Sequence, residues 1–189
     1  MMEKETNLDG KLLIAMPGMA DHNFDKSVIY MCSHSEDGAM GLIINKPSTD
    51  LDLNDLLKQL SFTPKNPISL KNIHIGGPVE YGRGFVLHSR DYQAKDATLN
   101  VTEDISMTAS LEILEDISQG DGPIKSLLAL GYSGWGPGQL ENEIQANGWL
   151  ISETPEDFLF SMDDDQKWNA ALKNIGIDPR MLSSKGGSA

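Results

Sequence analysis

Short apolar runs alternate with polar, glycine-containing breaks along most of the chain, and these runs predict strands. Runs rich in Val, Ile, Leu and Tyr at 11–16, 27–33 and 39–45 have the length and composition of strands. The turn signal Ser35-Glu36-Asp37-Gly38 separates the second run from the third, which predicts an antiparallel hairpin. Shorter strands are expected at 73–76, 84–88, 97–101, 124–130 and 149–152.

Helices are predicted where apolar residues recur every three or four positions. Four leucines form one face of a helix over 52–60, with Asp50 or Asp52 as its N-terminal cap. Gly120 ends a second predicted helix over 110–119. The residues of this second helix that are expected to face the core are Leu111, Leu114 and Ile117. Further helices are expected at 139–147, 156–160 and 165–175.

The order of these elements predicts the fold class. Strands come in short-linked groups that helices interrupt irregularly, which argues against a regular βαβ rhythm and a doubly wound parallel sheet. We therefore expect a mixed α+β fold, with a largely antiparallel sheet or flattened barrel and helices packed outside. The length suits one domain over residues 1–189. Its ordered core is expected at about 8–182, with 1–7 and 183–189 flexible.

The segment from Gly131 to Glu143 is the most distinctive of the chain. Four glycines, a proline and a tryptophan precede the predicted helix at 139–147, which indicates an ordered glycine-rich loop. No P-loop lysine follows, and Gly134-x-Gly136-x-Gly138 has the wrong spacing for a dinucleotide fingerprint. Glu141 and Glu143 in the first helical turn would also repel a bound anion. Two interpretations stay open: a structural turn before a capped helix, or a contact loop for a ligand or partner.

A second glycine-rich segment spans 76–84, and Arg83 is its only positive charge. If the two segments lie side by side, they would form a cleft for a small anionic or aromatic ligand, and Lys46 could line the same end of the sheet. In the alternative, Arg83 pairs with Glu80 or Glu141 of the protein itself. The hypothetical ligand-binding residues are Arg83, Lys46, Gly76, Gly77, Tyr132, Gly134, Trp135, Gly136, Gly138 and Glu141.

Cys32 and His34 lie two positions apart on a predicted strand, so they share a face. Such a pair can generate a thiolate nucleophile, whereas a cysteine in an apolar strand is more commonly an inert core residue. The four histidines show no metal-ligand spacing, so no metal site is expected. His74 lies between two isoleucines and is expected to be a surface or half-buried residue.

The charge balance narrows the class of partner. The net charge is −13, from 28 acidic and 15 basic residues, and only three arginines occur. Direct nucleic-acid binding is disfavoured, because it needs clustered Lys and Arg, and anionic membranes are disfavoured for the same reason. The chain carries no long apolar run and no signal-peptide pattern, and it has a single cysteine. These features predict a bacterial cytoplasmic protein.

Several motifs together resemble the AlgH/YqgE family of small bacterial proteins, from about Leu8 to the C-terminal tail. The strongest single match is Gly38-Ala39-Met40-Gly41-Leu42-Ile43-Ile44-Asn45-Lys46-Pro47. Two departures are visible, His22 in place of a proline and Pro137 in place of a small residue. The other matching stretches are Met16-Pro17-Gly18-Met19-Ala20-Asp21, Gly76-Gly77-Pro78-Val79 and Gly131 to Glu143.

The resemblance implies a transcriptional-regulator label that derives from a genetic link to exopolysaccharide control, and no established reaction, cofactor or catalytic residue. The leading hypothesis is a non-enzymatic regulatory or interaction protein that binds a protein or a small molecule and acts on transcription indirectly. The alternative is a small-molecule or nucleotide-binding protein, or an enzyme, that uses a cleft between the two glycine-rich segments. Cys32–His34 chemistry is a third hypothesis.

Overall fold

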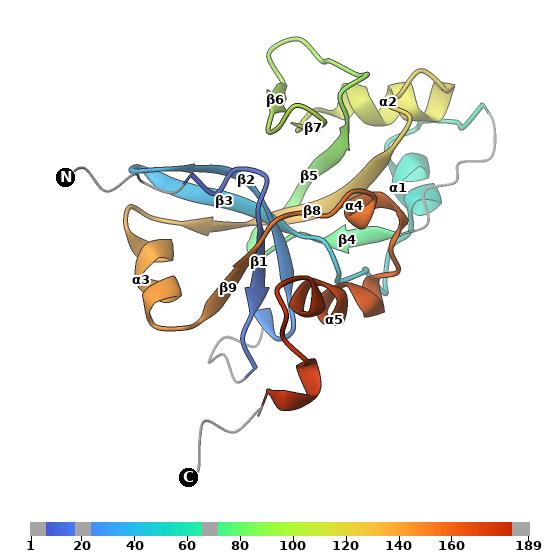
Figure 1. Ribbon diagram of the computed structural model, residues 1–189. Helices are drawn as coiled ribbons and strands as arrows, with labels where there is room; N and C mark the ends of the chain where they lie inside the picture. Colours follow the sequence, from blue (N-terminus) through green and yellow to red (C-terminus); the bar gives the residue numbers. More distant parts are fainter. Residues whose placement is uncertain (1–6, 18–23, 66–71, 183–189) are drawn as a thin grey trace.

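A long, curled β-sheet organises the chain in the computed structural model, which describes residues 7–17, 24–65 and 72–182 (Figure 1). Its path runs β6-β7-β5-β8-β3-β2-β1-β9, and every neighbour on this path is antiparallel. β4 lies off the path and pairs with β8 in parallel. The strands are β1 (Leu12–Ala15), β2 (Val28–Ser35), β3 (Gly38–Ile43), β4 (Ile73–Ile75), β5 (Val79–Ser89), β6 (Thr98–Asn100), β7 (Ile105–Thr108), β8 (Ser126–Trp135) and β9 (Trp149–Ser152).

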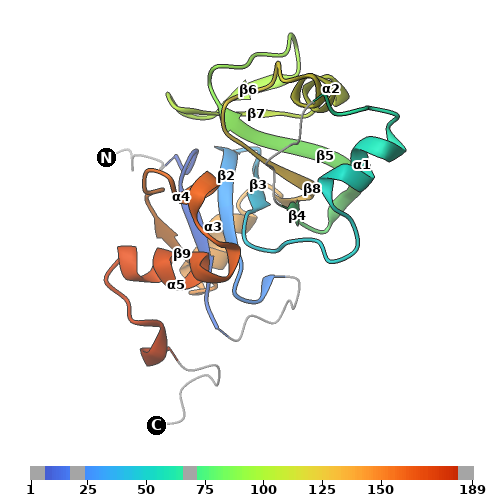
Figure 2. The same cartoon turned by 90° about the vertical axis from the view of Figure 1, so that its right-hand side faces the viewer.

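The helices lie around the edges and faces of this sheet (Figures 1 and 2). The mixed α+β class and the largely antiparallel sheet are confirmed, and so is the β2–β3 hairpin. Asp52 caps the first helix through a hydrogen bond from Asp55 N. The helices are α1 (Leu53–Gln59), α2 (Leu111–Gln119), α3 (Gln139–Gln145), α4 (Phe158–Ser161) and α5 (Asp164–Asn174), with a 3-10 turn at Pro179–Met181.

Both faces of the sheet are buried at β1 and along most of β2, which is why these two strands are nearly continuous apolar runs. Alternate residues of β2 show this: Tyr30 and Cys32 join a core with α4 and α5, whereas Ile29 and Met31 join a core with α3. A third core forms where α1 and α2 cover β4, β5 and β8. None of the described helices is long and apolar enough to cross a membrane.

Four details of the predicted elements are wrong. The strand expected at 84–88 begins at Val79, so β5 runs through most of the second glycine-rich segment. The run at 124–130 continues through the expected loop to Trp135, because the glycines there allow close backbone packing within the sheet. β7 was not expected, since its polar Ser106 and Thr108 are buried and hydrogen-bonded rather than exposed. In α2, Leu114 is buried as expected, but the expected core residue Leu111 is 60% exposed and Ile113 is buried instead. Residues two apart on a helix point about 200° apart, so Leu111 and Ile113 cannot both face the core.

Some sequence features lie outside the described residues. The last four residues of the Met16–Asp21 motif and His22 fall in 18–23, which is not described. Residues 1–6 and the tail at 183–189 are likewise not described.

Candidate functional site

The two glycine-rich segments meet where β8 changes partners. β8 pairs with β5 over 126–132 and with β4 over 128–130, then passes to β3 over 133–135. Gly131 has φ 72°, and a Cβ there would lie 2.6 Å from the carbonyl oxygen of Gly77. A Cβ on Gly77 would lie 2.2 Å from the backbone of Tyr132. These glycines therefore let backbones approach more closely than side chains allow, and they build a sheet junction.

The backbone groups of this junction bond within the protein. The Gly76 N–H donates to Leu130 O at 2.8 Å, and Ser133 Oγ donates to Gly76 O at 3.1 Å. Gly76 and Gly77 are both buried. The N–H of Gly76 is therefore used within the sheet junction and is not presented to a ligand.

An open depression of about 700 Å³ lies beside the junction, between β5, the end of β8 and the β2–β3 hairpin. It brings together four of the predicted residues, Arg83, Tyr132, Gly134 and Trp135. The Arg83 guanidinium lies 5.3 Å from the ring centroid of Phe85, within the range of a cation–π contact. Phe85 in turn packs edge-on against Tyr132, with ring centroids 5.6 Å apart.

A bulge in β5 positions Arg83. The pairing of β5 with β8 shifts between Val79 and Gly84, and Glu80 within the bulge has φ 51°. The Arg83 side chain is half exposed, and its Nη1 lies 3.4 Å from Glu80 Oε2. The predicted internal pairing of Arg83 is thus present with Glu80 and not with Glu141. An exposed pair of this length is weak, so the guanidinium is free to exchange it for another acceptor.

The remaining predicted residues lie elsewhere. Lys46 donates to Asp25 O at 2.5 Å and lines a separate cavity of about 250 Å³, so it does not join Arg83. Gly136 and Gly138 form the turn into α3, where the Gly136 N–H donates to Gln139 Oε1. Glu141 bonds His34 across 2.5 Å, and this hydrogen bond lowers the pKa of Glu141.

Cys32 and His34 do not contact each other. The imidazole of His34 bonds Leu8 N and Glu141, whereas Cys32 Sγ contacts Tyr30 O at 3.9 Å. Cys32 is fully buried, and burial raises the pKa of its thiol far above the ordinary value. A buried thiol of this kind is protonated at neutral pH and has the character of a core residue.

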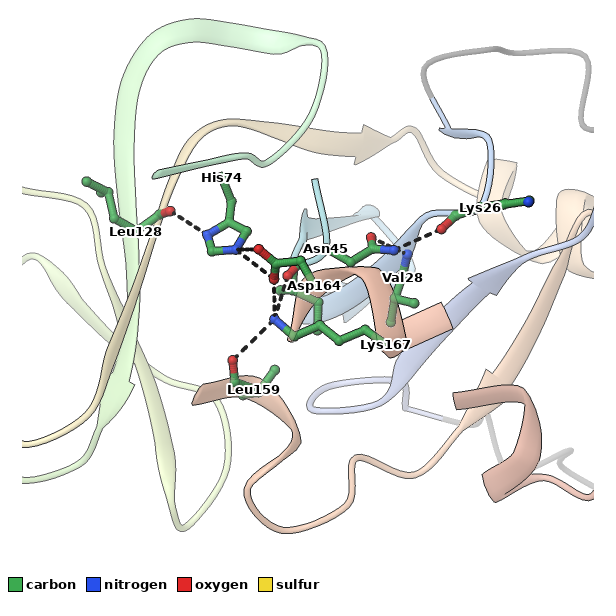
Figure 3. Close-up of polar contacts among 9 residues, drawn as sticks. Lys26, Val28, Asn45, His74, Leu128, Leu159, Asp164 and Lys167 are labelled. Carbon is green, nitrogen blue, oxygen red and sulfur yellow. Dashed lines mark hydrogen bonds and ion pairs between the residues drawn. The ribbon is translucent and has the colours of Figure 1, made fainter. Parts of the chain in front are cut away.

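A buried charge cluster was missed by sequence reasoning. Figure 3 shows the side chains of His74 and Lys167 converging on the carboxylate of Asp164. His74 Nε2 lies 2.8 Å from Asp164 Oδ2, and Lys167 Nζ lies 2.9 Å from Asp164 Oδ1. Lys167 also donates to Ile44 O at 2.7 Å and approaches Leu159 O at 3.5 Å. The cluster joins α5 to β4, to the end of β3 and to α4.

The pKa values of Asp164 and Lys167 depend on burial and on the ion pairs within this cluster. His74 and Lys167 are buried, at 6% and 1% exposed, so the expectation of a surface or half-buried His74 is wrong. Burial lowers the pKa of Lys167, and the bond and charge of Asp164 oppose that shift only in part. Burial alone would raise the pKa of Asp164, but His74 and Lys167 together hold it below its ordinary value. The His74–Asp164–Lys167 cluster is therefore structural, and removing one of its side chains leaves the others buried without a partner.

One feature of the sequence could have predicted the Asp164–Lys167 part of this cluster. Lys167 stands beside Trp168 and one turn before Ala171, on the face of its helix that packs against the core. A lysine on an apolar face needs a partner, and Asp164 lies three residues earlier on the same face. Nothing local in the sequence indicated that His74 would meet them. Among the described residues, no group of three or more His, Cys, Asp and Glu could hold a metal ion.

Comparisons with known proteins agree with this architecture. A family model described as AlgH-like matches residues 12–180. A UPF0301 protein of Ruegeria pomeroyi is 54% identical over 184 residues, which cover 97% of this chain and 100% of that protein. One of Paracoccus denitrificans is 49% identical over 191 residues, with 100% of both chains covered.

Two solved structures are similar to the chain. The solution structure of the AlgH protein from Pseudomonas aeruginosa is 39% identical, with a TM-score of 0.78 and 100% of both chains covered. A crystal structure of protein DIP2367 from Corynebacterium diphtheriae is 21% identical, with a TM-score of 0.70, and covers 96% of this chain and 92% of that one. The second likeness is one of fold alone.

Proposed function

The chain belongs to the AlgH-like family, and we propose that it is a non-enzymatic regulatory protein that binds a protein partner through the depression around Arg83. Its effect on transcription would then be indirect, through that partner. The observation that carries the proposal is the half-exposed Arg83 on the β5 bulge, backed by two aromatic rings.

The make-up of the depression suits a protein surface. Arg and Tyr are the residue types that most often carry binding energy at interfaces, and Phe85 and Tyr132 give Arg83 a rigid support. The depression is broad and open rather than enclosed, and the neighbouring bulge presents Tyr81 at 60% exposure. A partner segment with a carboxylate could replace Glu80 at the guanidinium and cover the exposed ring.

The charge of the chain favours a protein over DNA. A net charge of −13 repels a phosphate backbone, and the depression itself contains Asp37 and Glu80 beside its one arginine. A single exposed guanidinium fits one acidic group of a partner rather than a row of phosphates.

Truncation of Arg83 is expected to weaken partner binding by about 30-fold or more, because a central arginine of an interface contributes about 2 kcal/mol or more. The measurement is quantitative mass spectrometry of proteins that co-purify with tagged wild type and with Arg83→Ala. Arg180→Ala is a matched control, because Arg180 is also an exposed arginine that pairs with a nearby carboxylate, Asp178. Proteins retained by wild type and Arg180→Ala but lost by Arg83→Ala are the expected result.

A set of co-purifying proteins that is the same for all three chains would remove Arg83 from the proposal.

The alternative is a small planar anion in the same depression, favoured by the cation–π geometry of Arg83. A thermal-shift screen separates the two, since a ligand at 100 times its Kd adds about 2.7 kcal/mol of stability. A hit that Arg83→Ala abolishes would favour the small molecule.

A further inference from the structure

His34 lies in the β2–β3 hairpin and joins two parts of the chain that are distant in sequence. Its side chain is 10% exposed, and its two ring nitrogens have different partners. Nδ1 lies 3.3 Å from the backbone N of Leu8, and Nε2 lies 2.5 Å from Glu141 Oε1 on α3. The imidazole therefore connects residues 7–11, which precede β1, with α3.

These partners determine where the imidazole carries its hydrogen. A backbone N–H can only donate, so Nδ1 accepts from Leu8 and carries no hydrogen. An ionised carboxylate can only accept, so Nε2 carries the hydrogen and donates it to Glu141. The hydrogen bond from His34 lowers the pKa of Glu141, which keeps this carboxylate ionised in mild acid. The contacts thus require a neutral His34 with its hydrogen on Nε2.

Protonation of His34 would break only one of the two contacts. A hydrogen on Nδ1 would face the N–H of Leu8, so two donors would oppose each other and the Leu8 amide would lose its acceptor. The contact with Glu141 would instead become a charge-assisted pair of an imidazolium and a carboxylate. The released state binds one more proton than the closed state, so release grows as the pH falls, by at most about tenfold per pH unit.

Leu8 is the residue that protonation of His34 would release. Its side chain is 2% exposed and belongs to the same core as Trp149, and its carbonyl accepts from Lys11 N at 2.9 Å. The next attachment along the chain does not titrate, because Gly10 N donates to Met31 O at 2.8 Å. Release would therefore free Leu8 and leave Gly10 in place.

The charges around His34 are compatible with a positively charged imidazole. β3 carries no titratable side chain, and burial raises the pKa of Tyr30 and Cys32 on β2, so both stay neutral in acid. The one cation near by, Lys11, is paired with Glu153. Acidic groups predominate among the remaining charged residues of the neighbouring segments, which are Asp9 before β1, Glu36 and Asp37 in the hairpin turn, and Glu143 on α3.

We propose that His34 is an acid-sensitive latch on the segment before β1. Neutral His34 holds Leu8 in the core, and protonated His34 releases Leu8 while it keeps its contact with Glu141. Release uncovers the apolar surface on which Leu8 packs. The latch is independent of the partner surface around Arg83, and either proposal can fail without the other.

The test is amide exchange measured by NMR on the full chain at pH 7.5 and 5.5, corrected for the intrinsic pH dependence of exchange. Protection of the Leu8 and Lys11 amides is expected to fall at least about fivefold at pH 5.5, whereas that of Ile14 in β1 stays within about twofold. His34→Asn has an amide oxygen that accepts from Leu8 but does not titrate, so it is expected to keep the protection at both pH values. Glu36→Gln, which changes an exposed carboxylate of the hairpin turn, is expected to behave as wild type.

The imidazole gives a second readout. Its nitrogen chemical shifts at pH 7.5 are expected to show a neutral ring with the hydrogen on Nε2. The proposal is overturned if the hydrogen resides on Nδ1, or if protection of Leu8 in wild type changes no more than that of Ile14. It is also overturned if folded His34→Asn loses the protection in acid as wild type does. The first two results come from wild type alone, so they decide the question even if the variant does not fold.

Discussion

Gly131→Ala is expected to lower the free energy of unfolding by about 2–5 kcal/mol. The left-handed φ of 72° costs a non-glycine residue about 1–2 kcal/mol, and the new Cβ would meet backbone oxygens of Gly77 at 2.6 Å and Val79 at 3.0 Å. The Val79 oxygen cannot move without disturbing the pairing of β5 with β8. Urea unfolding, followed by circular dichroism, measures the change.

Gly138 provides the matched control. Its φ is 75°, but nothing lies within 4 Å of a Cβ at that position. Gly138→Ala is therefore expected to cost only the conformational part, about 1–2 kcal/mol. If the two variants lose equal stability, close backbone packing at the junction contributes nothing, and the glycine-rich segment needs another explanation.

Asp164→Asn is expected to destabilise the protein by about 3–5 kcal/mol, because it leaves the ammonium of Lys167 buried without a counter-charge. In a chain of this length that corresponds to a fall in Tm of roughly 6–20 °C. Asp165→Asn, in the same helical turn but exposed, is expected to change stability by no more than about 0.5 kcal/mol.

A double substitution tests the pairing itself. Asp164→Asn with Lys167→Met removes both charges, so it is expected to recover part of the stability that Asp164→Asn loses. Recovery is incomplete because the carbonyls of Ile44 and Leu159 lose their donor. If the double variant is less stable than Asp164→Asn alone, the charge pair is not the origin of the loss.

The pH dependence of the same variant has a definite sign. The pKa of Asp164 is lowered in the folded protein, so its contribution is fully present above the unfolded pKa of about 3.9 and is lost as pH falls through the folded value. The stability difference between wild type and Asp164→Asn should thus shrink as the pH falls below about 4. A difference that is unchanged at pH 3 would contradict the lowered pKa.

Local patterns predicted most of the fold. Alternating burial is absent from β1 and from most of β2, because both faces are covered there. Apolar runs with turn signals still placed β1, β2 and β3 within a few residues. β7 was not predicted because its buried Ser106 and Thr108 are hydrogen-bonded to side chains on other strands, Asn100 and His88. Such cross-strand pairs depend on tertiary register, which no local pattern contains.

The candidate site was predictable only in part. Two glycine-rich segments around one arginine indicated a shared surface, and Arg83 does line one depression together with Tyr132 and Trp135. Lys46 was grouped with them because it closely follows the predicted strand at 39–45, but its ammonium donates to the backbone carbonyl of Asp25 instead. The contact between His74 and Asp164 joins residues 90 positions apart, so it could not be predicted from local sequence patterns.

Site-specific photocrosslinking in cells tests the central claim, that the depression around Arg83 is a protein-binding surface, most directly. A photoreactive phenylalanine in place of Asp37, an exposed residue of the depression, is compared with one in place of Asp165, an exposed residue outside it. The account predicts a discrete crosslinked species from position 37 alone, and its loss when Arg83→Ala is added. No crosslink from position 37 in a folded protein, or the same species from both positions, would contradict it.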